Sequence, residues 1–538
     1  MIFGLTLLAA LAVPLAANDL VQQRTLTQHV PDVVARGTAA RVGELPARQM
    51  MELTISLPSR NEAELQSLLA AMNDPASPLY RHFLSVSQFT ARYGPSQSDY
   101  RSLLGFALAH HLRPHALVAN RRVLDVQGTV ADVERAFDVR MGLYRHPTEP
   151  RSFYAPDREP TLALGVPVLH ISGLDDYVQP VARVERGSQA EGIEKIHTGS
   201  GPQGNFVGSD IRAAYYGGTA LAGTGESLGL FEYRGYNIAD VENYFAQVGQ
   251  ENDVPIVGES VNGADLKCTG KCDDSEQVLD MEEALSMAPS LTQLVVYVGH
   301  NDVSIINQMA SDGTSKQLSC SWGWGPDPTA LDPIFEELAA QGQSFFVATG
   351  DDGFRLKKGV VWPADDQLVT AVGGTDLTTH GPGGPWRSER GWKFSGGGPS
   401  PDGIPIPKYQ VPFITAQNGG STTLRNVPDI AGDADTDNFS CFDGRCYTHV
   451  GGTSFAAPLW AGFMALANQY AAATERPPIG FLNPALYRIG SASDYSQLFH
   501  DEVVGYNGKY SAETGFDLVT GFGSPNGDAL IRALALGR

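Results

Sequence analysis

Basic residues are scarce in this chain of 538 residues, where 38 Lys and Arg accompany 60 Asp and Glu and give a net charge of −22. Nucleic acids require Lys and Arg against their phosphates, so this balance argues against a nucleic-acid partner. The acidic excess alone is typical of a solvated surface. Apolar residues make up 42%, which excludes global disorder, and the length predicts two folded units.

Long apolar runs are missing beyond the amino terminus. Residues 2–17 form an apolar run that is too short for a membrane span and ends in Ala16 and Ala17, before the polar Asn18. Small residues at that point suit signal peptidase, although no Lys or Arg precedes the run. We therefore expect a signal peptide at 1–17, a secreted protein and no membrane partner.

Cysteine is equally sparse, with five residues that all follow position 260. Cys268 and Cys272 are close in sequence, as are Cys441 and Cys446, and Cys320 is left over. In an exported protein such pairs indicate two short-loop disulfides. Metal binding is the alternative, and it is disfavoured because the loops between the paired cysteines contain no His and because export favours oxidation.

The first 182 residues predict a compact α+β unit without a catalytic constellation of its own. In residues 18–182, the strand-like segment 51–57 precedes a predicted helix that begins after Asn61, with Glu64 placed for a capping box. Apolar residues recur there at helical spacing, at Leu65, Leu68, Leu69 and Met72. Residues 183–205 are polar and rich in Gly, which predicts an exposed linker that proteases can cut.

Residues 206–538 alternate short apolar runs with helical patterns, which predicts an α/β fold with a parallel sheet and helices on both faces. Functional side chains should then gather at the carboxyl ends of the strands. The predicted strands are 227–233, 294–298, 344–348 and 368–372, and the predicted helices include 238–248 and 276–287.

The octet Gly-Gly-Thr-Ser-Phe-Ala-Ala-Pro at 451–458 places Ser454 between a glycine turn and a helix start. The amino end of a helix favours developing negative charge nearby. A Ser that only caps the helix is the alternative interpretation. The complete octet resembles the nucleophile segment of the subtilisin-like clan of peptidases.

Histidine in a suitable context is absent from this half of the chain. A subtilisin-type site needs a His base and an Asp partner, but none of the four His residues stands in a His-Gly-Thr-His context: His300, His380, His449 and His500. Glu276 and Asp280, four residues apart on a predicted helix, are the candidate base and its partner. A solvated acidic helix face is the alternative for this pair.

A third acidic segment, Thr-Gly-Asp-Asp-Gly at 349–353, follows the apolar strand 344–348. Asp351 stands where subtilisins carry the Asn of the oxyanion hole, and an ordinary acidic turn is the alternative. With these three motifs the whole chain resembles the sedolisin family of serine-carboxyl peptidases. Three further segments match that family, at 319–323, 371–375 and 427–429.

The resemblance implies a role for each residue and a subtilisin-like α/β peptidase domain behind a separate pro-domain. Ser454 would be the nucleophile, Glu276 the general base, Asp280 its orienting partner and Asp351 the oxyanion donor. Glu232 and Trp322 occupy positions that extend the carboxyl pair in some members. A carboxylate base requires acid pH, and Asp351 must be protonated to donate, so its pKa should be raised. We therefore expect activity confined to acidic pH.

The resemblance also implies one structural Ca²⁺ near the carboxyl terminus. Asp501 and Asp517 would give carboxylate oxygens, and Glu502, Glu513 and Gly515 would give main-chain oxygens, a mixture that suits Ca²⁺. The family usually has Gly at position 513 and an aliphatic residue at 502, but both positions contribute only their carbonyls. Two ordinary acidic loops are the alternative.

Residues 74–82 resemble the family's pro-region, which implies that residues 18–182 act as folding chaperone and inhibitor. The expected partners are protein or peptide substrates and this pro-domain, with self-catalysed release at the 183–205 linker and a monomeric peptidase at 206–538. Removal of amino-terminal tripeptides is the alternative activity within the family. The missing His motif opposes a conventional subtilisin, and the presence of all four catalytic candidates opposes an inactive secreted binding protein.

Overall fold

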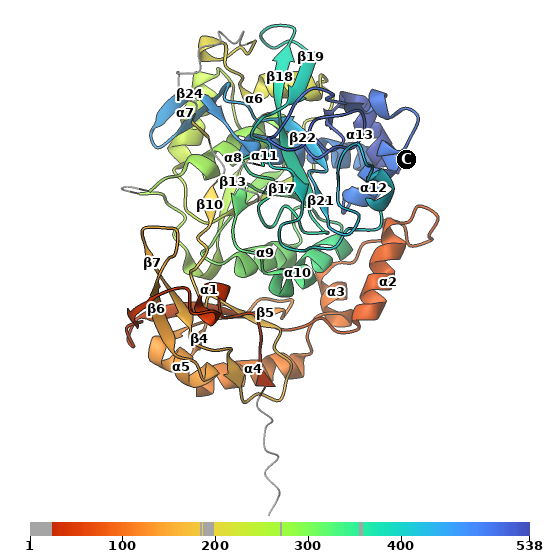
Figure 1. The fold of residues 1–538 in the computed structure, drawn as a ribbon. Helices are drawn as coiled ribbons and strands as arrows, with labels where there is room; N and C mark the ends of the chain where they lie inside the picture. The colour runs from red at the N-terminus through yellow and green to blue at the C-terminus, as the bar shows by residue number, and fades with distance from the viewer. Residues whose placement is uncertain (1–23, 183–184, 187–197, 270–271, 355–358, 538) are drawn as a thin grey trace, which may run out of the picture.

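The computed structural model describes residues 24–182, 185–186, 198–269, 272–354 and 359–537. The predicted signal peptide at 1–17 lies outside them. A smaller amino-terminal unit lies against one side of a larger unit (Figure 1). In the described part of the chain, no helix is both long and apolar enough to cross a membrane.

The amino-terminal unit is built on an antiparallel sheet with the order β4-β5-β3-β9. Helices α4 and α5 bury their apolar residues against it, and a second antiparallel sheet has the order β2-β6-β7. Its elements are β1 (Arg24–Thr25), α1 (Asp32–Ala35), β2 (Arg41–Glu44), β3 (Met50–Ser56), α2 (Glu62–Asn73), α3 (Val86–Arg92), α4 (Gln97–Ala109), β4 (Arg113–Pro114), β5 (Val123–Thr129), α5 (Val130–Phe137), β6 (Met141–Arg145), β7 (Ser152–Pro156), β8 (Thr161–Leu162), β9 (His170–Ser172) and β10 (Val181–Ala182).

Helix α2 begins where the sequence predicts, but the predicted capping box is wrong. Asn61 adopts a left-handed conformation with φ of 54° and its side chain makes no capping hydrogen bond. Its amide instead donates to the carbonyl of Arg92, whose guanidinium pairs with Glu64. The four apolar residues predicted to face inward are buried.

The larger unit contains an eight-stranded sheet with the order β13-β14-β12-β15-β17-β18-β19, in which β22 also pairs with β18. All pairs are parallel except β18 with β19, so the predicted α/β fold is confirmed. The elements are β11 (Glu185–Arg186), α6 (Gly208–Tyr215), β12 (Ser227–Glu232), α7 (Ile238–Gln247), β13 (Ile256–Ser260), α8 (Ser275–Met287), β14 (Gln293–Val298), α9 (Asp302–Asp312), β15 (Gln317–Cys320), β16 (Trp322–Gly323), α10 (Pro328–Ala340), β17 (Ser344–Ala348), β18 (Thr370–Thr379), β19 (Trp386–Gly391), β20 (Gly398–Pro399), β21 (Asn426–Val427), β22 (Ile430–Asp433), β23 (Asn438–Phe442), β24 (Arg445–Gly451), α11 (Thr453–Ala473), α12 (Asn483–Gly490), β25 (Phe499–His500), β26 (Ser524–Pro525) and α13 (Gly527–Leu536).

Apolar clusters cover both faces of this sheet, and successive side chains on a strand point to opposite faces. On β17, Phe346 and Ala348 join the apolar cluster of α8 and α11, whereas Phe345 and Val347 join that of α9 and α10. Helices α9 and α10 therefore separate the sheet from the amino-terminal unit (Figure 1).

The two units are joined by buried polar contacts. Arg122 donates from Nε to Glu337 Oε2 on α10 at 3.0 Å, and both side chains are 1% exposed. Asp125 accepts from Ser304 on α9 at 2.6 Å. Away from these contacts, Arg81 of the amino-terminal unit donates to the carbonyls of α13 in the larger unit.

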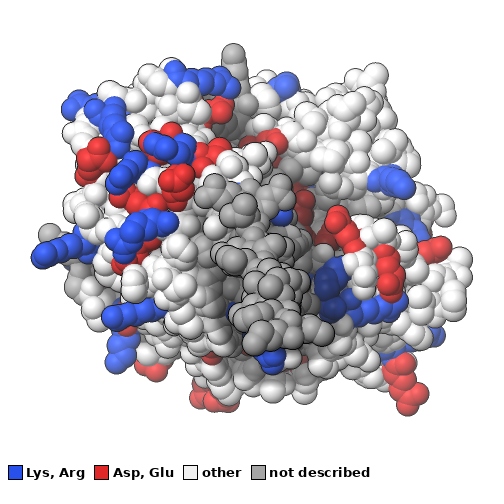
Figure 2. Space-filling model, turned by 90° about the horizontal axis from the view of Figure 1, so that it is seen from below, with Lys and Arg blue, Asp and Glu red and all other residues white. Residues whose placement is uncertain are grey.

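Figure 2 shows the molecule from below the view of Figure 1. On this face, Lys and Arg side chains lie among Asp and Glu side chains, as on a solvated surface.

Part of the predicted linker is anchored to the larger unit. The Thr198 and Thr379 hydroxyls are hydrogen bonded, and Asn205 is fully buried. The amide of Ser200 donates to Asp210 on α6. Residues 198–205 are thus held by the fold, and the boundaries at 182 and 205 stay predictions.

Candidate active site

Helix α8 lies entirely inside the protein, since all thirteen of its residues are buried. Glu276 and Asp280 are 1% and 0% exposed. The interpretation of this pair as a solvated acidic face is therefore wrong. Burying acidic side chains costs free energy unless other groups hydrogen bond to them. Acidic residues on a buried helix therefore indicate that the carboxyl groups have a role in the fold or in the function.

Asp280 belongs to a buried carboxyl cluster with Glu232, which ends strand β12. The charge of Glu232 disfavours the ionised form of Asp280, so the two carboxyls are electrostatically linked. Trp322 Nε1 donates to Glu232 Oε2 at 2.9 Å, and Ser321 Oγ donates to Asp280 Oδ1 at 2.7 Å. The cluster therefore shares protons as one coupled group.

Burial is the main reason why this cluster retains its protons. It raises the pKa of Glu232 well above its ordinary value, and the nearby charge of Glu276 raises it further. Burial likewise raises the pKa of Asp280 well above its ordinary value, with a further contribution from Glu232. Charged carboxylates crowded in a dry site disfavour one another, so protonated forms prevail.

Ser454 lies in the first turn of α11 and is fully buried. The N-cap of that helix is Gly452, with φ of 137°, so the interpretation of Ser454 as a capping residue is wrong. Only glycine adopts this backbone conformation readily. The Ser is thereby placed just inside the amino end of a buried helix.

Asp351 follows strand β17 and is fixed to the same segment. Its Oδ1 accepts from the Thr453 amide at 2.8 Å and from Thr453 Oγ1 at 2.9 Å. The Gly350 amide donates to Thr453 Oγ1 at 3.0 Å. These bonds place Asp351 one residue from Ser454, which an ordinary acidic turn would not require.

The candidate residues thus meet at one edge of the sheet. Strands β12, β15 and β17 are neighbours in the sheet, and their carboxyl ends lead to Glu232, to Ser321 with Trp322, and to Asp351. Helix α8 packs beside α11 in the centre of the unit (Figure 1). The predicted gathering at carboxyl strand ends is what the structure shows for these residues.

Two polar residues of this site are not predicted by the sequence. The Ser321 hydroxyl holds Asp280, and Thr453 holds Asp351. Each of these residues lies next to a candidate residue within a motif. This position in the sequence could have marked them as site residues, but nothing in the sequence shows which carboxylate each one contacts.

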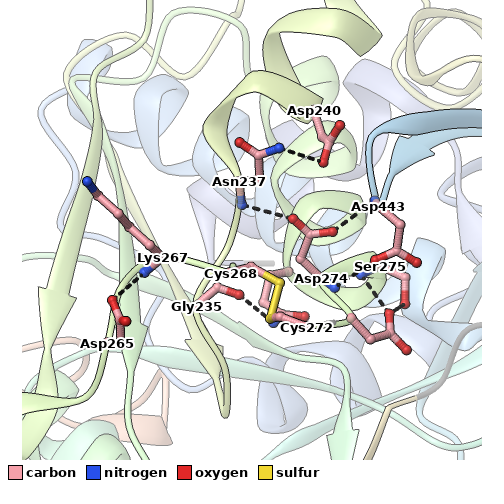
Figure 3. The surroundings of a disulfide bond; sticks show 12 residues. Gly235, Asn237, Asp240, Asp265, Lys267, Cys268, Cys272, Asp274, Ser275 and Asp443 are labelled. Carbon is pink, nitrogen blue, oxygen red and sulfur yellow. Dashed lines mark hydrogen bonds between the residues drawn. A yellow bond between two sulfur atoms is a disulfide. The ribbon is translucent and has the colours of Figure 1, made fainter. Parts of the chain in front are cut away.

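A disulfide stands immediately before α8 (Figure 3). Cys268 and Cys272 are bonded, and so are Cys441 and Cys446, which confirms the two predicted pairs and excludes the metal interpretation for them. Cys320 is free and buried. Asp274 accepts from the amides of Asn237 and Asp443, each at 2.9 Å, so the start of α8 is tied to two other segments (Figure 3).

Comparison with known proteins decides the family. Over 533 residues the chain is 31% identical to kumamolisin from Bacillus sp. (strain MN-32), covering 91% of this chain and 93% of that protein. The chain belongs to the sedolisin family of serine-carboxyl peptidases. Residues 38–177 match the pro-kumamolisin activation domain, and residues 248–481 match the subtilase family.

Other sedolisin-family proteins agree over most of their length. The chain is 24% identical over 549 residues to tripeptidyl-peptidase 1 of Homo sapiens, covering 92% of this chain and 93% of that one. The solved structure of Pseudomonas sedolisin, complexed with two molecules of pseudo-iodotyrostatin, superposes with a TM-score of 0.53 at 26% identity, covering 63% of this chain and 98% of that one. This sedolisin-family chain is accordingly a serine-type peptidase with an activation domain.

The segments predicted to bind calcium in this sedolisin-family chain are brought together. Asp501 accepts from the Gly515 amide at 3.1 Å, and Asp517 Oδ2 accepts from the Glu513 amide at 2.9 Å. Burial raises the pKa of Asp501, and it raises that of Asp517 to about 7. In the part of the chain that the structure describes, neither carboxylate pairs with Lys or Arg, so a cation would offset their charge.

The remaining members of the set are predicted to contribute only main-chain carbonyls. The side chain of Glu502 is 2% exposed and its Oε1 accepts from Ser524 Oγ at 3.3 Å, whereas the predicted role falls to its carbonyl. Among the described residues, no group of three or more His, Cys, Asp or Glu side chains could hold a metal ion. The predicted set has two carboxylates and depends on main-chain oxygens, which are donors that Ca²⁺ accepts.

Proposed function

We propose that this peptidase is a secreted, acid-acting serine-carboxyl endopeptidase, made as a self-processing zymogen. The observation that carries this proposal is the meeting of Ser454, the buried carboxyl cluster and Asp351 at one edge of the sheet. The apolar amino-terminal run and the two disulfides support export, and we expect the mature enzyme to act as a monomer.

In the proposed mechanism, Ser454 Oγ attacks the substrate carbonyl while Glu276 accepts the hydroxyl proton. The peptide C–N bond then breaks, and the proton leaves with the amine. Water attacks the resulting ester and releases the carboxyl product, which regenerates Ser454. Asp280 and Glu232 retain a proton and orient Glu276. Protonated Asp351 donates a hydrogen bond to the oxyanion.

The pH dependence follows from the need for a protonated donor. A carboxyl group at position 351 can donate only when it carries a proton, so activity is present at low pH and is lost as the pH rises. We expect kcat/KM for a quenched peptide to fall about tenfold per pH unit on the alkaline side. Asp351→Asn donates at every pH, so its alkaline limit should move upward by a pH unit or more. An unmoved limit would show that another group sets it.

We propose further that Asp501 and Asp517, with the carbonyls of Glu502, Glu513 and Gly515, bind one structural Ca²⁺. Chelation by EGTA should lower the melting temperature by about 5 °C, because ligand at a hundred times its Kd stabilises by about 2.7 kcal/mol. Calorimetry with and without EGTA measures this shift. Asp517→Asn should melt early and ignore EGTA; equal responses of both proteins would contradict the site.

Removal of amino-terminal tripeptides is the second candidate, favoured by the similarity to tripeptidyl-peptidase 1. A peptide pair that differs only in an acetylated amino terminus distinguishes the two activities. An endopeptidase cuts both peptides, whereas a tripeptidyl-peptidase cuts only the free one. Absence of any cleavage at acid pH would instead favour an inactive binding protein.

A further inference from the structure

Residues 80–86 of the amino-terminal unit form a short segment, here called the strap, that contacts the larger unit where its helices end. Arg81 donates from Nη2 to the carbonyl of Leu534 at 2.7 Å and from Nη1 to that of Ala535 at 3.2 Å, near the end of α13. The amide of Leu84 donates to the carbonyl of the last residue of α10 at 2.9 Å. The last carbonyls of a helix have no partner within it and carry partial negative charge, so they accept such donors well.

Glycines of the larger unit leave room for the side chains of the strap. A Cβ on Gly342 would come within 2.5 Å of the Phe83 ring, and a Cβ on Gly480 would overlap the same ring. The φ angles of these two glycines are 72° and 75°, in the left-handed region that favours glycine. At the end of α9, a Cβ on Gly313 would meet Val86 at 2.6 Å. The two glycines around the ring thus form a notch that receives one aromatic side chain.

The segment that resembles the family's pro-region holds the strap in a turn. The side chains of Asp74 and Ser77 each accept from the amide two residues on, at 2.9 and 3.1 Å, as is typical of such turns. The turn presents Arg81, which is 5% exposed, and Phe83 to the larger unit, whereas His82 is exposed to solvent. The motif therefore presents a cation and a ring, two residues apart, to another surface.

The surface beneath the strap is apolar and hollowed. Helix α2 lies beside α10 (Figure 1) and closes an apolar cluster that includes Ala339, Ala340 and Phe481 of the larger unit. Cavities of about 680 and 410 Å³ flank the strap, and Lys316 and Gln341 line both of them. Release of the amino-terminal unit would open a groove made of the notch, these apolar residues and the helix-end carbonyls. An apolar surface with polar groups at its rim marks an interaction site.

This groove lies at the edge of the sheet opposite the candidate active site. Gly313 stands between α9 and β15, and Gly342 stands between α10 and β17, so both lie at the amino ends of these strands. The candidate catalytic residues follow the carboxyl ends of the same strands. A strand of five residues such as β17 spans about 16 Å. A peptide in the groove would therefore leave Ser454 accessible.

We propose that, once the amino-terminal unit has left, the groove is an exosite, a binding site separate from the active site. It binds a segment of a protein substrate that carries an arginine and, two residues on, an aromatic side chain. The arginine takes the place of Arg81 at the carbonyls of α13, and the ring takes the place of Phe83 between Gly342 and Gly480. The exosite needs only the release of the amino-terminal unit and not the proposed chemistry at Ser454.

A labelled peptide of residues 73–87 tests the binding. Acidification, or an added acid protease if Ser454 does not process the chain, frees the enzyme of its amino-terminal unit. Fluorescence anisotropy at pH 7 should then show saturable binding. Peptides with Arg81→Ala or Phe83→Ala should bind at least tenfold more weakly, and the matched control His82→Ala should bind within twofold of the parent. The zymogen, whose groove is filled, should bind at least tenfold more weakly than the freed enzyme.

A substitution in the enzyme gives an independent test. Gly342→Asn should weaken peptide binding at least tenfold, because its side chain fills the notch while Asn tolerates a positive φ. Gly249→Asn is the matched control, since Gly249 has a φ of 67° and a Cβ there would meet nothing within 4 Å. Equal binding of all peptides, or no saturable binding, would overturn the exosite. A freed enzyme that elutes as a dimer and ignores the peptide would show that a second copy covers the groove instead.

Kinetics test whether the exosite serves substrates. Joining residues 73–87 to a quenched peptide through a flexible linker should lower KM at least fivefold and leave kcat unchanged. The same fusion with Phe83→Ala should gain nothing. Hydrolysis with equal KM for both fusions would overturn the role of the groove in substrate binding. Saturable binding of the labelled peptide without hydrolysis of any substrate at acid pH would overturn the proposed function and leave the binding site standing.

Discussion

Glu276→Gln is expected to lower kcat/KM for peptide hydrolysis by about 10³-fold at acid pH. A general base contributes typically 10²- to 10⁴-fold, and Gln keeps the volume of Glu but accepts no proton. Because Glu276 is 1% exposed, water is poorly placed to substitute as the base. Ser454→Ala should lose at least as much, since no acyl-enzyme can form.

Glu283→Gln provides the matched control on the same helix. Glu283 is also buried, and burial raises its pKa to about 8, so it is neutral at acid pH and Gln imitates that form. We expect its kcat/KM to stay within threefold of the parent. Initial rates on a quenched peptide measure all three variants, and similar losses for both Gln variants would show that helix packing, not base catalysis, was disturbed.

Arg122→Ala is expected to weaken the docking of the amino-terminal unit by about 10²- to 10⁴-fold. Removing one partner of a buried ion pair costs about 3–5 kcal/mol, because the other charge stays buried. Glu337 would still accept hydrogen bonds from the side-chain amides of Asn120 and Gln341, but it would lose the guanidinium of Arg122 that balances its charge. After maturation, the cleaved unit should no longer co-elute with the peptidase in gel filtration at pH 6.

Arg36→Ala is the control for this second variant. Arg36 pairs with Asp32 in the same unit, but both side chains are more than 70% exposed, and such pairs contribute little. We expect it to co-elute as the parent does. Arg122→Lys should fall between the two, because it keeps the charge but not the guanidinium geometry. Unchanged co-elution of Arg122→Ala would place the docking energy elsewhere on α9 and α10.

The sequence predicts the parallel sheet and most of its elements because both rest on local patterns. Apolar runs such as 344–348 coincide with β17, and the periodicity of 276–287 coincides with α8 within one residue. The capping box at Asn61 failed because Arg92, distant in sequence, offers Glu64 a better partner than the helix end does. Local signals are overruled where a long-range contact competes.

For the site, the sequence identifies residue types and order but not their partners. The pairing of Glu232 with Trp322 and of Asp351 with Thr453 depends on which strands are neighbours. The burial of all of α8 was also hidden, since four acidic residues in thirteen are typical of a surface helix. The pairing of β10 with β16 and of β11 with β24 could not be predicted, because the sequence at 181–186 has no strand pattern of its own.

The contacts between the two units have a consequence for how latency ends. Arg122, Asp125 and Arg81 touch α10, α9 and α13, and none of these contacts passes through the connection at 182–185. A cut in the proposed linker would therefore leave a nicked complex in which the amino-terminal unit is still bound. Separation of the two pieces would be a reversible two-body equilibrium. Dilution would favour this separation, and a concentrated compartment would oppose it.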